Sequence, residues 1–345
     1  MWLLDLGEFG GHGLERNPQN LKGTPDSPDH GPIPSFFTLM TKVFFKSTQK
    51  NLEKARSPIE KESHTFRSPP LYESRKKESY TSRSPTIINK MTIYTYIFCW
   101  NEEKILKFTL DHYSQFSDRI FLLDNYSTDN SLKIASKYDK VTVIPISCEE
   151  EEDTYDEFKS AKLRSTIYKD ETYGFQAVDK ADWAILVDAD EFVYHPDLVN
   201  VLKGYKQQGV AIPRLAGYDM VSKEFPTYTK GELLTSKVKR GVESLSESKP
   251  VIIDPNKVEV KFSVGAHFHS EVRGSAYPSV NADIKLLHYK SLSKDYVIRR
   301  YKQLAPRSSC TNKANKFGEH WYSKKCHKGM EEGFDQAYKN TKKVI

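Results

Sequence analysis

The chain has 345 residues, a formal net charge of +6 and four widely spaced cysteines. This length allows one large or two ordinary domains, and the cysteine spacing is typical of reduced thiols in a cytosol-like compartment. Residues 1–90 hold 14 of the 52 Lys and Arg and 10 of the 46 Asp and Glu, so the remainder has only two more basic than acidic residues. Such a nearly neutral body argues against a dedicated nucleic-acid-binding protein, which should present a basic face.

Residues 1–90 have the composition of a low-complexity segment. They contain 9 of the 17 prolines and three copies of Arg-Ser-Pro. A segment of this kind buries too little apolar surface to offset its ordering entropy, so we predict that it is largely disordered. The apolar stretch over 34–45 is shorter than the ~20 residues that span a bilayer, and the N-terminus lacks the features of a signal peptide. We expect a cytoplasmic location and no transmembrane segment, and association with a membrane surface stays open.

From Met91 onward, two kinds of segment alternate along the chain. β-Branched and aromatic runs predict strands at 93–100, 119–123, 141–146, 183–187 and 210–215. Amphipathic runs predict helices at 102–115, 128–138, 157–180 and 197–207, with Ser127 as the N-cap of the second. This alternation predicts an α/β fold with a mixed, mainly parallel sheet flanked by helices.

The regular alternation ends near residue 215. Residues 249–270 predict a β-hairpin that turns at 254–256, and residues 282–304 predict a strand followed by a helix. His288 directly follows the apolar run "IKLL" and therefore lies at a predicted strand end.

Polar residues follow several of the predicted strands. Asn101 and Glu102 follow the first, Asp124 the second, and the stretch "AILVDADEFVYHP" places Asp188 and Asp190 after the fourth. In open α/β sheets, ligands bind at the carboxyl ends of strands, so these side chains are candidates for one binding site. No Gly-X-Gly-X-X-Gly or Gly-X4-Gly-Lys-Ser/Thr pattern occurs, which argues against a dinucleotide site or a P-loop.

The acids at 188 and 190 have two interpretations. Acidic residues favour turns and helix caps, and Asp188 and Asp190 could serve only that purpose. Alternatively, two carboxylates at positions i and i+2 can bind a divalent cation together with substrate phosphates, since Mg²⁺ and Mn²⁺ prefer oxygen ligands.

Four segments in order along the chain resemble the family-2-like glycosyltransferases of GT-A fold. They are "YIFCWNEEKILKFTLDHY", "IFLLDNYSTDNS", "DWAILVDADEF" and "IKLLHYKSLS". The resemblance implies a metal-dependent enzyme that moves a sugar from a nucleotide-diphosphate donor to a hydroxyl acceptor, with inversion. It covers roughly residues 91–310, so we expect three regions, which are the N-terminal segment 1–90, a glycosyltransferase domain over 91–310 and a C-terminal helical extension over 311–345.

The resemblance also assigns roles to individual residues. Asn101, Glu102 and Asp124 stand where the family contacts the nucleotide base and ribose. Asp188 and Asp190 match the Asp-X-Asp motif, in which the first acid reaches the ribose or the metal and the second ligates the metal. His288 matches a histidine that completes the metal site in many GT-A enzymes. The implied cofactor is Mn²⁺ or Mg²⁺, and we expect Asp190 and His288 to share this ion.

The chemistry of such a reaction also requires a base. Negative charge builds on the departing diphosphate, which a cation stabilises, while a carboxylate takes the proton of the acceptor hydroxyl. Asp219 and Glu224, which follow the fifth predicted strand, are candidates by position, and Glu243 is another. A glycan, a lipid-linked molecule and a protein all remain open as acceptors.

Two alternatives belong to other functional classes. "LVDADEFV" also resembles the nucleophile motif of haloacid-dehalogenase-like phosphatases, although that motif normally follows the first strand of its domain and three strands precede it here. The second alternative is a non-catalytic protein that binds sugar nucleotides or glycans. Release of free phosphate from an aryl phosphate, or binding without turnover, would distinguish these alternatives from a glycosyltransferase.

Overall fold

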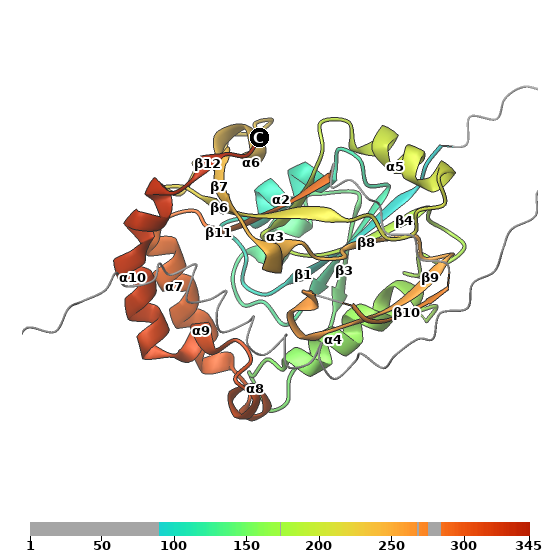
Figure 1. Cartoon of the computed structure of the whole chain (residues 1–345). Helices are drawn as coiled ribbons and strands as arrows, with labels where there is room; N and C mark the ends of the chain where they lie inside the picture. The colour runs from blue at the N-terminus through green and yellow to red at the C-terminus, as the bar shows by residue number, and fades with distance from the viewer. Residues whose placement is uncertain (1–89, 173, 268, 275–283) are drawn as a thin grey trace, which may run out of the picture. The chain divides into compact units, whose positions relative to one another are not determined.

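The computed structural model of the protein describes residues 90–172, 174–267, 269–274 and 284–345 (Figure 1). The predicted low-complexity segment therefore lies outside the described residues, except for Lys90. All described residues belong to one compact unit.

The first of two five-stranded sheets has the strand order β3-β2-β1-β4-β8. Strands β3, β2, β1 and β4 are parallel, and β8 pairs antiparallel with β4 at one edge. All seven residues of β1 are buried, as expected for a central strand that is covered on both faces. The strands are β1 (Ile93–Cys99), β2 (Arg119–Asp124), β3 (Val141–Pro145), β4 (Trp183–Asp188) and β8 (Ile252–Ile253).

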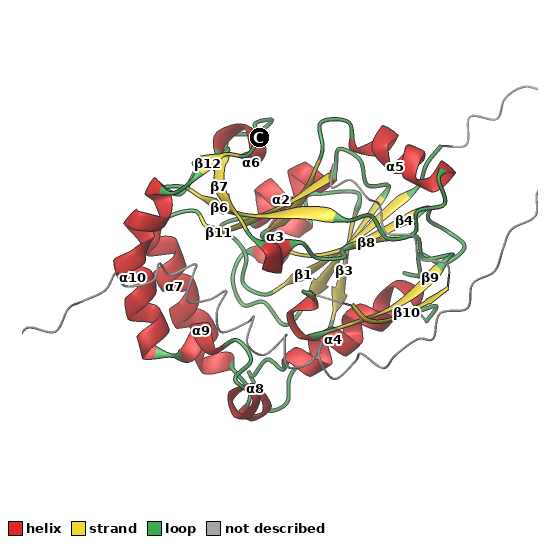
Figure 2. Ribbon diagram, in the orientation of Figure 1, coloured by secondary structure: helices red, strands yellow, loops and turns green. Residues whose placement is uncertain are grey.

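Alternate residues of β1 enter different apolar clusters. Ile93 and Ile97 pack with residues of α2, α3 and α5, whereas Tyr94 and Tyr96 pack with residues of η2 and β9. The prediction of a mixed α/β fold, with a mainly parallel sheet flanked by helices, is therefore confirmed (Figure 2). The covering elements are α2 (Leu106–Tyr113), α3 (Ser131–Ala135), α5 (Leu198–Gln207), η2 (Ile167–Lys169) and β9 (Val258–Phe262), and α4 (Glu157–Thr166) precedes η2.

The second sheet has the order β12-β7-β6-β11-β5, in which only β6 and β11 are parallel. The chain leaves β4 at Asp188 and starts β5 at Glu191, so the two residues between them carry it from the first sheet into the second. Residues 188–191, called the acidic turn below, therefore lie at the junction of the two sheets. The strands are β5 (Glu191–Tyr194), β6 (Leu215–Val221), β7 (Arg240–Glu243), β11 (Ile284–Ser291) and β12 (Lys342–Lys343).

Short helices and a helical C-terminal segment complete the described chain. The predicted extension over 311–345 is mainly helical, but it ends in β12, which pairs antiparallel with β7 of the second sheet. Across the part of the chain that the structure describes, none of the helices combines the length and the apolar character needed to cross a bilayer. The remaining helices are α6 (Leu234–Lys237), η3 (Leu245–Glu247), η4 (Val264–Ala266), α7 (Lys294–Leu304), η5 (Ala305–Arg307), α8 (Cys310–Asn315), α9 (Glu319–Tyr322) and α10 (Lys324–Lys339).

Two predicted helices are too long. The helix predicted over 157–180 ends as α4 and η2, because Asp170 Oδ1 accepts a hydrogen bond from Thr172 N (2.8 Å) and forms a turn. Of the helix predicted over 128–138, only α3 (Ser131–Ala135) is helical, and its N-cap is Asn130 rather than the predicted Ser127. Side chains of the strand ends bind the backbone N–H groups of residues 127–129 and hold them in a loop instead.

Two predicted strand arrangements are also wrong. The strand predicted over 210–215 starts only at Leu215 and continues as β6. The predicted hairpin around 254–256 does not form, because β8 joins β4 while β9 pairs with β10 (His269–Gly274). The fully buried side chains of Ile252 and Ile253 explain the first pairing, since β8 gains burial at the edge of the first sheet.

Candidate functional site

The acidic turn is held from behind by helix α2. The hydroxyl groups of Thr109 and Tyr113 donate hydrogen bonds to the carbonyl oxygens of Ala189 (2.6 Å) and Glu191 (2.7 Å). Within the turn, Asp188 N donates to Glu191 Oε2 (2.9 Å). Because side chains satisfy these backbone groups, the turn is firmly positioned.

The end of β1 lies between two of the predicted strand ends. In the sheet register, Phe98 is opposite Asp188 of β4, and Cys99 is opposite Asp124 of β2. The carboxyl ends of β1, β2 and β4 therefore meet at one edge of the first sheet, as the sequence predicts.

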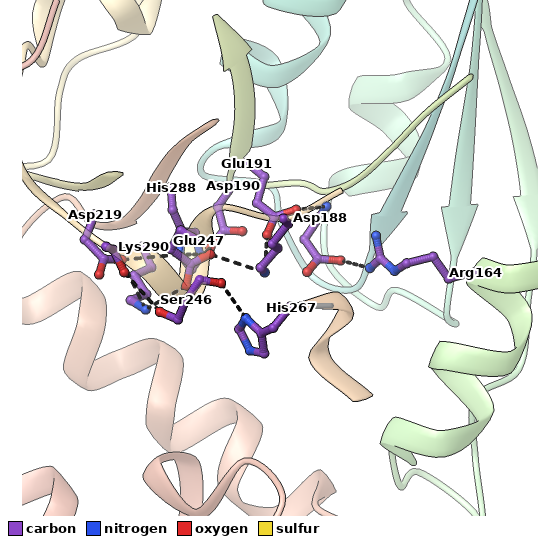
Figure 3. Close-up of polar contacts among 12 residues, drawn as sticks. Arg164, Asp188, Asp190, Glu191, Asp219, Ser246, Glu247, His267, His288 and Lys290 are labelled. Atoms are coloured by element: carbon purple, nitrogen blue, oxygen red, sulfur yellow. Dashed lines mark hydrogen bonds and ion pairs between the residues drawn. The ribbon is translucent and has the colours of Figure 1, made fainter. Parts of the chain in front are cut away.

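His288 lies inside β11, between β5 and β6 of the second sheet, rather than at a strand end as predicted, because the strand continues to Ser291. Its register partners are Glu191 on one side and Asp219 on the other. Neighbouring positions 287 and 289 pack into an apolar cluster with residues of α2, so His288 and Lys290 point to the opposite face of the sheet. Figure 3 shows His288 among the acidic side chains on this face.

The His288 ring contacts a different carboxylate with each nitrogen. Nε2 lies 3.4 Å from Asp190 Oδ2, although the two residues are 98 positions apart. Nδ1 lies 3.4 Å from Asp219 Oδ1 and 3.3 Å from Glu247 Oε2. A separation of 3.4 Å between Asp190 Oδ2 and His288 Nε2 fits two ligands of one ion, because atoms that each lie about 2.0–2.2 Å from a shared cation are at most ~4.4 Å apart.

Glu247 is a member of this cluster that sequence reasoning missed. It belongs to η3, which packs directly on β6 at Gly217. Gly217 N donates to Ser248 Oγ (3.1 Å), and Ser244 N donates to Gly217 O (2.9 Å). A glycine within the strand-like run "RLAGYDMV" was the available signal, because glycine in a strand often marks a close backbone approach.

Gly217→Ala should destabilise the protein. A Cβ at this position would lie 2.2 Å from the carbonyl carbon of Glu247, so η3 would have to move off β6. We expect a loss of about 1–3 kcal/mol in the free energy of unfolding, measured by urea denaturation. Gly204→Ala in helix α5 is the matched control, since its nearest neighbouring atom would be 3.9 Å away, and it should leave stability unchanged or raise it by up to ~1 kcal/mol. Equal effects of the two substitutions would contradict the packing argument.

Three basic side chains are interleaved with the acids. Lys249 Nζ lies 2.5 Å from Glu191 Oε1 and 3.3 Å from Glu247 Oε2. Lys290 Nζ lies 3.2 Å from Asp219 Oδ1. The third basic side chain is Arg164 of α4. Its Nη2 lies 2.5 Å from Asp188 Oδ1, and its guanidinium group packs on the Phe98 ring.

The cluster carries more negative than positive charge. Five carboxylates face three basic side chains, which leaves two net negative charges when His288 is neutral. Burial alone would raise the pKa of Asp190, but His288 lowers it to about 2, so this carboxylate is ionised at neutral pH. Burial alone would lower the pKa of His288, but Glu247 and Asp190 raise it well above its ordinary value. Both shifts show that the cluster favours added positive charge.

The predicted nucleotide-contacting residues at the edge of the first sheet hold the loops around them. Asn101 Oδ1 accepts hydrogen bonds from the backbone N–H groups of residues 128 (2.7 Å) and 129 (3.2 Å), and Asp124 accepts one from Ser127 N (3.1 Å). Glu102 pairs with Arg300, which also donates to Trp100 O (3.0 Å).

The carboxyl group of Glu102 lies within electrostatic reach of the acidic turn. Burial raises its pKa to about 8, Arg300 opposes the increase, and the charges of Asp190 and Asp188 add to it. The edge of the first sheet and the acidic turn thus lie next to each other, at the carboxyl ends of β1 and β4.

The candidate bases occupy different environments. Asp219 lies inside β6 rather than after a strand, and it is buried against His288 and Lys290. Glu224 is exposed in the loop after β6, and Glu243 is exposed at the end of β7. The structure therefore brings Asp219 into the acidic cluster and leaves the other two outside it.

Comparisons with known proteins find similarity only among solved structures. No family model matches the sequence, and no curated protein is similar to it. S. aureus TarS 1-349 in complex with UDP-GlcNAc is 12% identical over 72% of this chain and 74% of that chain, with a TM-score of 0.35. Glucosyl-3-phosphoglycerate synthase from Mycobacterium tuberculosis, in complex with Mn²⁺ and UDP-Glc, is 17% identical over 37% of this chain and 44% of that chain, with a TM-score of 0.25.

Mannosyl-3-phosphoglycerate synthase from Rubrobacter xylanophilus is similarly distant. It is 17% identical over 37% of this chain and 40% of that chain, with a TM-score of 0.26. The chain also spans only 39% of the longer S. aureus TarS chain. All of these TM-scores are below 0.5.

Proposed function

We propose that the protein is a metal-dependent glycosyltransferase of GT-A type, which moves a sugar from a nucleotide-diphosphate donor to a hydroxyl acceptor with inversion. The observation that carries the proposal is the approach of Asp190 and His288 at the junction of the two sheets. Asp190 belongs to the turn between β4 and β5, and His288 belongs to β11. The two side chains nevertheless face each other near the carboxyl ends of the parallel strands. This is the place where open α/β sheets bind ligands.

The residues present fit a divalent cation. The Asp190 carboxylate and His288 Nε2 would hold it, and a mixed oxygen and imidazole set suits Mn²⁺, for which Mg²⁺ could substitute. Asp188 keeps 42% of its side chain exposed and is available to the ion or to the donor ribose. Once His288 has released its proton to bind the ion, the cluster has two surplus negative charges, which match the charge of one such ion. When bound, the cation supplies Lewis-acid stabilisation of the negative charge that develops on the diphosphate.

The rest of the site would bind and orient the donor. Asn101, Glu102 and Asp124 border the edge of the first sheet, where we place the nucleotide base and ribose. Arg164 holds Asp188 from the side of α4 and leaves Asp190 to the ion.

A donor screen tests the proposal. The full chain would be incubated with UDP-, GDP- and TDP-linked sugars, with and without Mn²⁺, and release of nucleoside diphosphate would be measured. We expect release from at least one donor only when the metal is present. Release of phosphate from an aryl phosphate would instead favour the phosphatase alternative, and donor binding without release would favour the non-catalytic alternative.

Asp219→Asn should abolish sugar transfer while sparing donor affinity, if Asp219 takes the proton of the acceptor hydroxyl. We expect transfer to fall at least ~100-fold, because general-base catalysis typically contributes 10²–10⁴-fold. Donor dissociation constants and transfer rates would be measured together, with Glu224→Gln as the comparison variant. Loss of transfer in Glu224→Gln, with Asp219→Asn still active, would move the base to the loop after β6.

A further inference from the structure

Glu247 connects the candidate cation site to a buried lysine. Its side chain is 3% exposed, and its Oε2 lies 3.3 Å from both His288 Nδ1 and Lys249 Nζ. Lys249 is 5% exposed and also contacts Glu191 Oε1 at 2.5 Å. A buried ammonium thus lies between two buried carboxylates, and one of these carboxylates faces the histidine.

This geometry has a rival interpretation. Ligand atoms of Glu191, Glu247 and His288 all lie within 4.8 Å of one another, so these three residues by themselves could hold a metal ion. Lys249 Nζ, however, already contacts both glutamates. An ammonium group and a divalent cation repel each other strongly in a buried setting, so the two cannot share this pair of carboxylates.

The two nitrogens of the His288 ring face opposite sides of the cluster. With Nδ1 beside Glu247, the opposite nitrogen Nε2 is directed to Asp190. The Glu247 carboxylate (3.3 Å) and the Asp219 carboxylate (3.4 Å) both lie on the Nδ1 side of the ring, so their negative charge holds this nitrogen away from Asp190. Carboxylates commonly orient metal-binding histidines through the nitrogen that does not bind the metal.

Resting on the metal-dependent function proposed above, we infer that Glu247 is a positioning residue that directs His288 Nε2 to the cation, and that Lys249 keeps Glu191 and Glu247 out of its ligand set. The cation then binds on the Asp190 side of the ring, and the glutamates act only through His288.

A double-mutant cycle on Mn²⁺ affinity tests this inference. The full chain, with Mn²⁺ alone as the probe, would be titrated as wild type, Glu247→Gln, His288→Ala and the double variant. We expect Glu247→Gln to bind Mn²⁺ about 10-fold more weakly, because loss of such an outer partner typically costs 10–100-fold. The double variant should bind no more weakly than His288→Ala, since Glu247 has nothing left to orient.

Three further measurements complete the experiment. Electron spin-echo spectra of bound Mn²⁺ should contain an imidazole nitrogen coupling that His288→Ala removes. Glu247→Asp keeps the charge beside Lys249 but withdraws the carboxylate from the ring, so it should reproduce the non-additive loss even if the Gln variant folds poorly. Glu171→Gln, an exposed residue in the turn after η2, is the matched control and should bind like the wild type.

The possible failures are distinct. If the wild type binds no Mn²⁺, the proposed metal-dependent function fails and the inference falls with it. If Mn²⁺ binds through His288 but the double variant is weaker than His288→Ala by the full effect of Glu247→Gln, Glu247 is itself a ligand and the inference alone is overturned. Wild-type affinity in both Glu247 variants would overturn it as well.

Discussion

Asp190→Ala should lower metal-dependent release of nucleoside diphosphate by several orders of magnitude. The substitution removes one of the two side chains that approach each other at 3.4 Å across the sheet junction. Charge stabilisation by a bound cation is typically worth several kcal/mol, and about 1.36 kcal/mol corresponds to a tenfold change in rate. Initial rates would be measured over a range of Mn²⁺ concentrations, so that weaker metal binding and slower turnover can be separated.

The same measurement has two comparison variants. His288→Ala should weaken the apparent Mn²⁺ affinity more gently, because water can replace one ligand. Asp139→Ala removes an exposed aspartate in the turn before β3, and it should leave the rates unchanged. Asp190→Ala also removes the carboxylate beside His288 Nε2, so its melting temperature should fall modestly, and the rates would be measured at a temperature where both proteins are folded. Rates within tenfold of the wild type at saturating Mn²⁺ would leave the acidic turn as a turn-forming and capping feature only.

Lys249→Met should cost about 3–5 kcal/mol in the free energy of unfolding. The ammonium group is buried between Glu191 and Glu247, and removal of one partner from a buried charge group leaves the remaining charges uncompensated. Burial alone would lower the pKa of Lys249, but the two carboxylates raise it above its ordinary value, so the lysine is charged in the folded protein. Urea unfolding followed by circular dichroism would give the free energy.

Lys257→Met is the matched control for this prediction. Lys257 also pairs with an acid, Asp254 Oδ2 at 3.9 Å, but its side chain is 36% exposed. Asp254 is buried but keeps a shorter pair with Lys206 Nζ (2.8 Å), and a partly exposed lysine of this kind contributes about 0–1 kcal/mol, so the control should lose little stability. A loss below about 1 kcal/mol in Lys249→Met would mean that Glu191 and Glu247 are neutral or solvated in the folded protein.

The apolar runs of the sequence were sufficient to predict the four parallel strands of the first sheet. Strands β1, β2 and β4 end within one residue of the predicted positions, because each is a buried run that stops at a polar residue. Parallel strands place their carboxyl ends at one edge, so the approximate location of Asp124 and Asp188 followed from the alternation of elements alone. These features depend on local composition and on the side-chain period of a strand.

Tertiary structure decided the second sheet and the interior of the site. The stretch "VESLSESKP" has the composition of a solvated loop, yet Glu247 and Lys249 within it are buried. Their burial is tolerable only because each has a partner from a distant part of the chain. Glu191 supplies the opposite charge for Lys249, and His288 contacts Glu247. Likewise, the turn between β8 and β9 suggested that these two strands pair with each other, but β8 pairs with β4 and β9 pairs with β10. Composition and periodicity describe what one segment prefers, whereas the charge partners of a buried group and the pairing of a strand depend on segments that only the folded chain brings together.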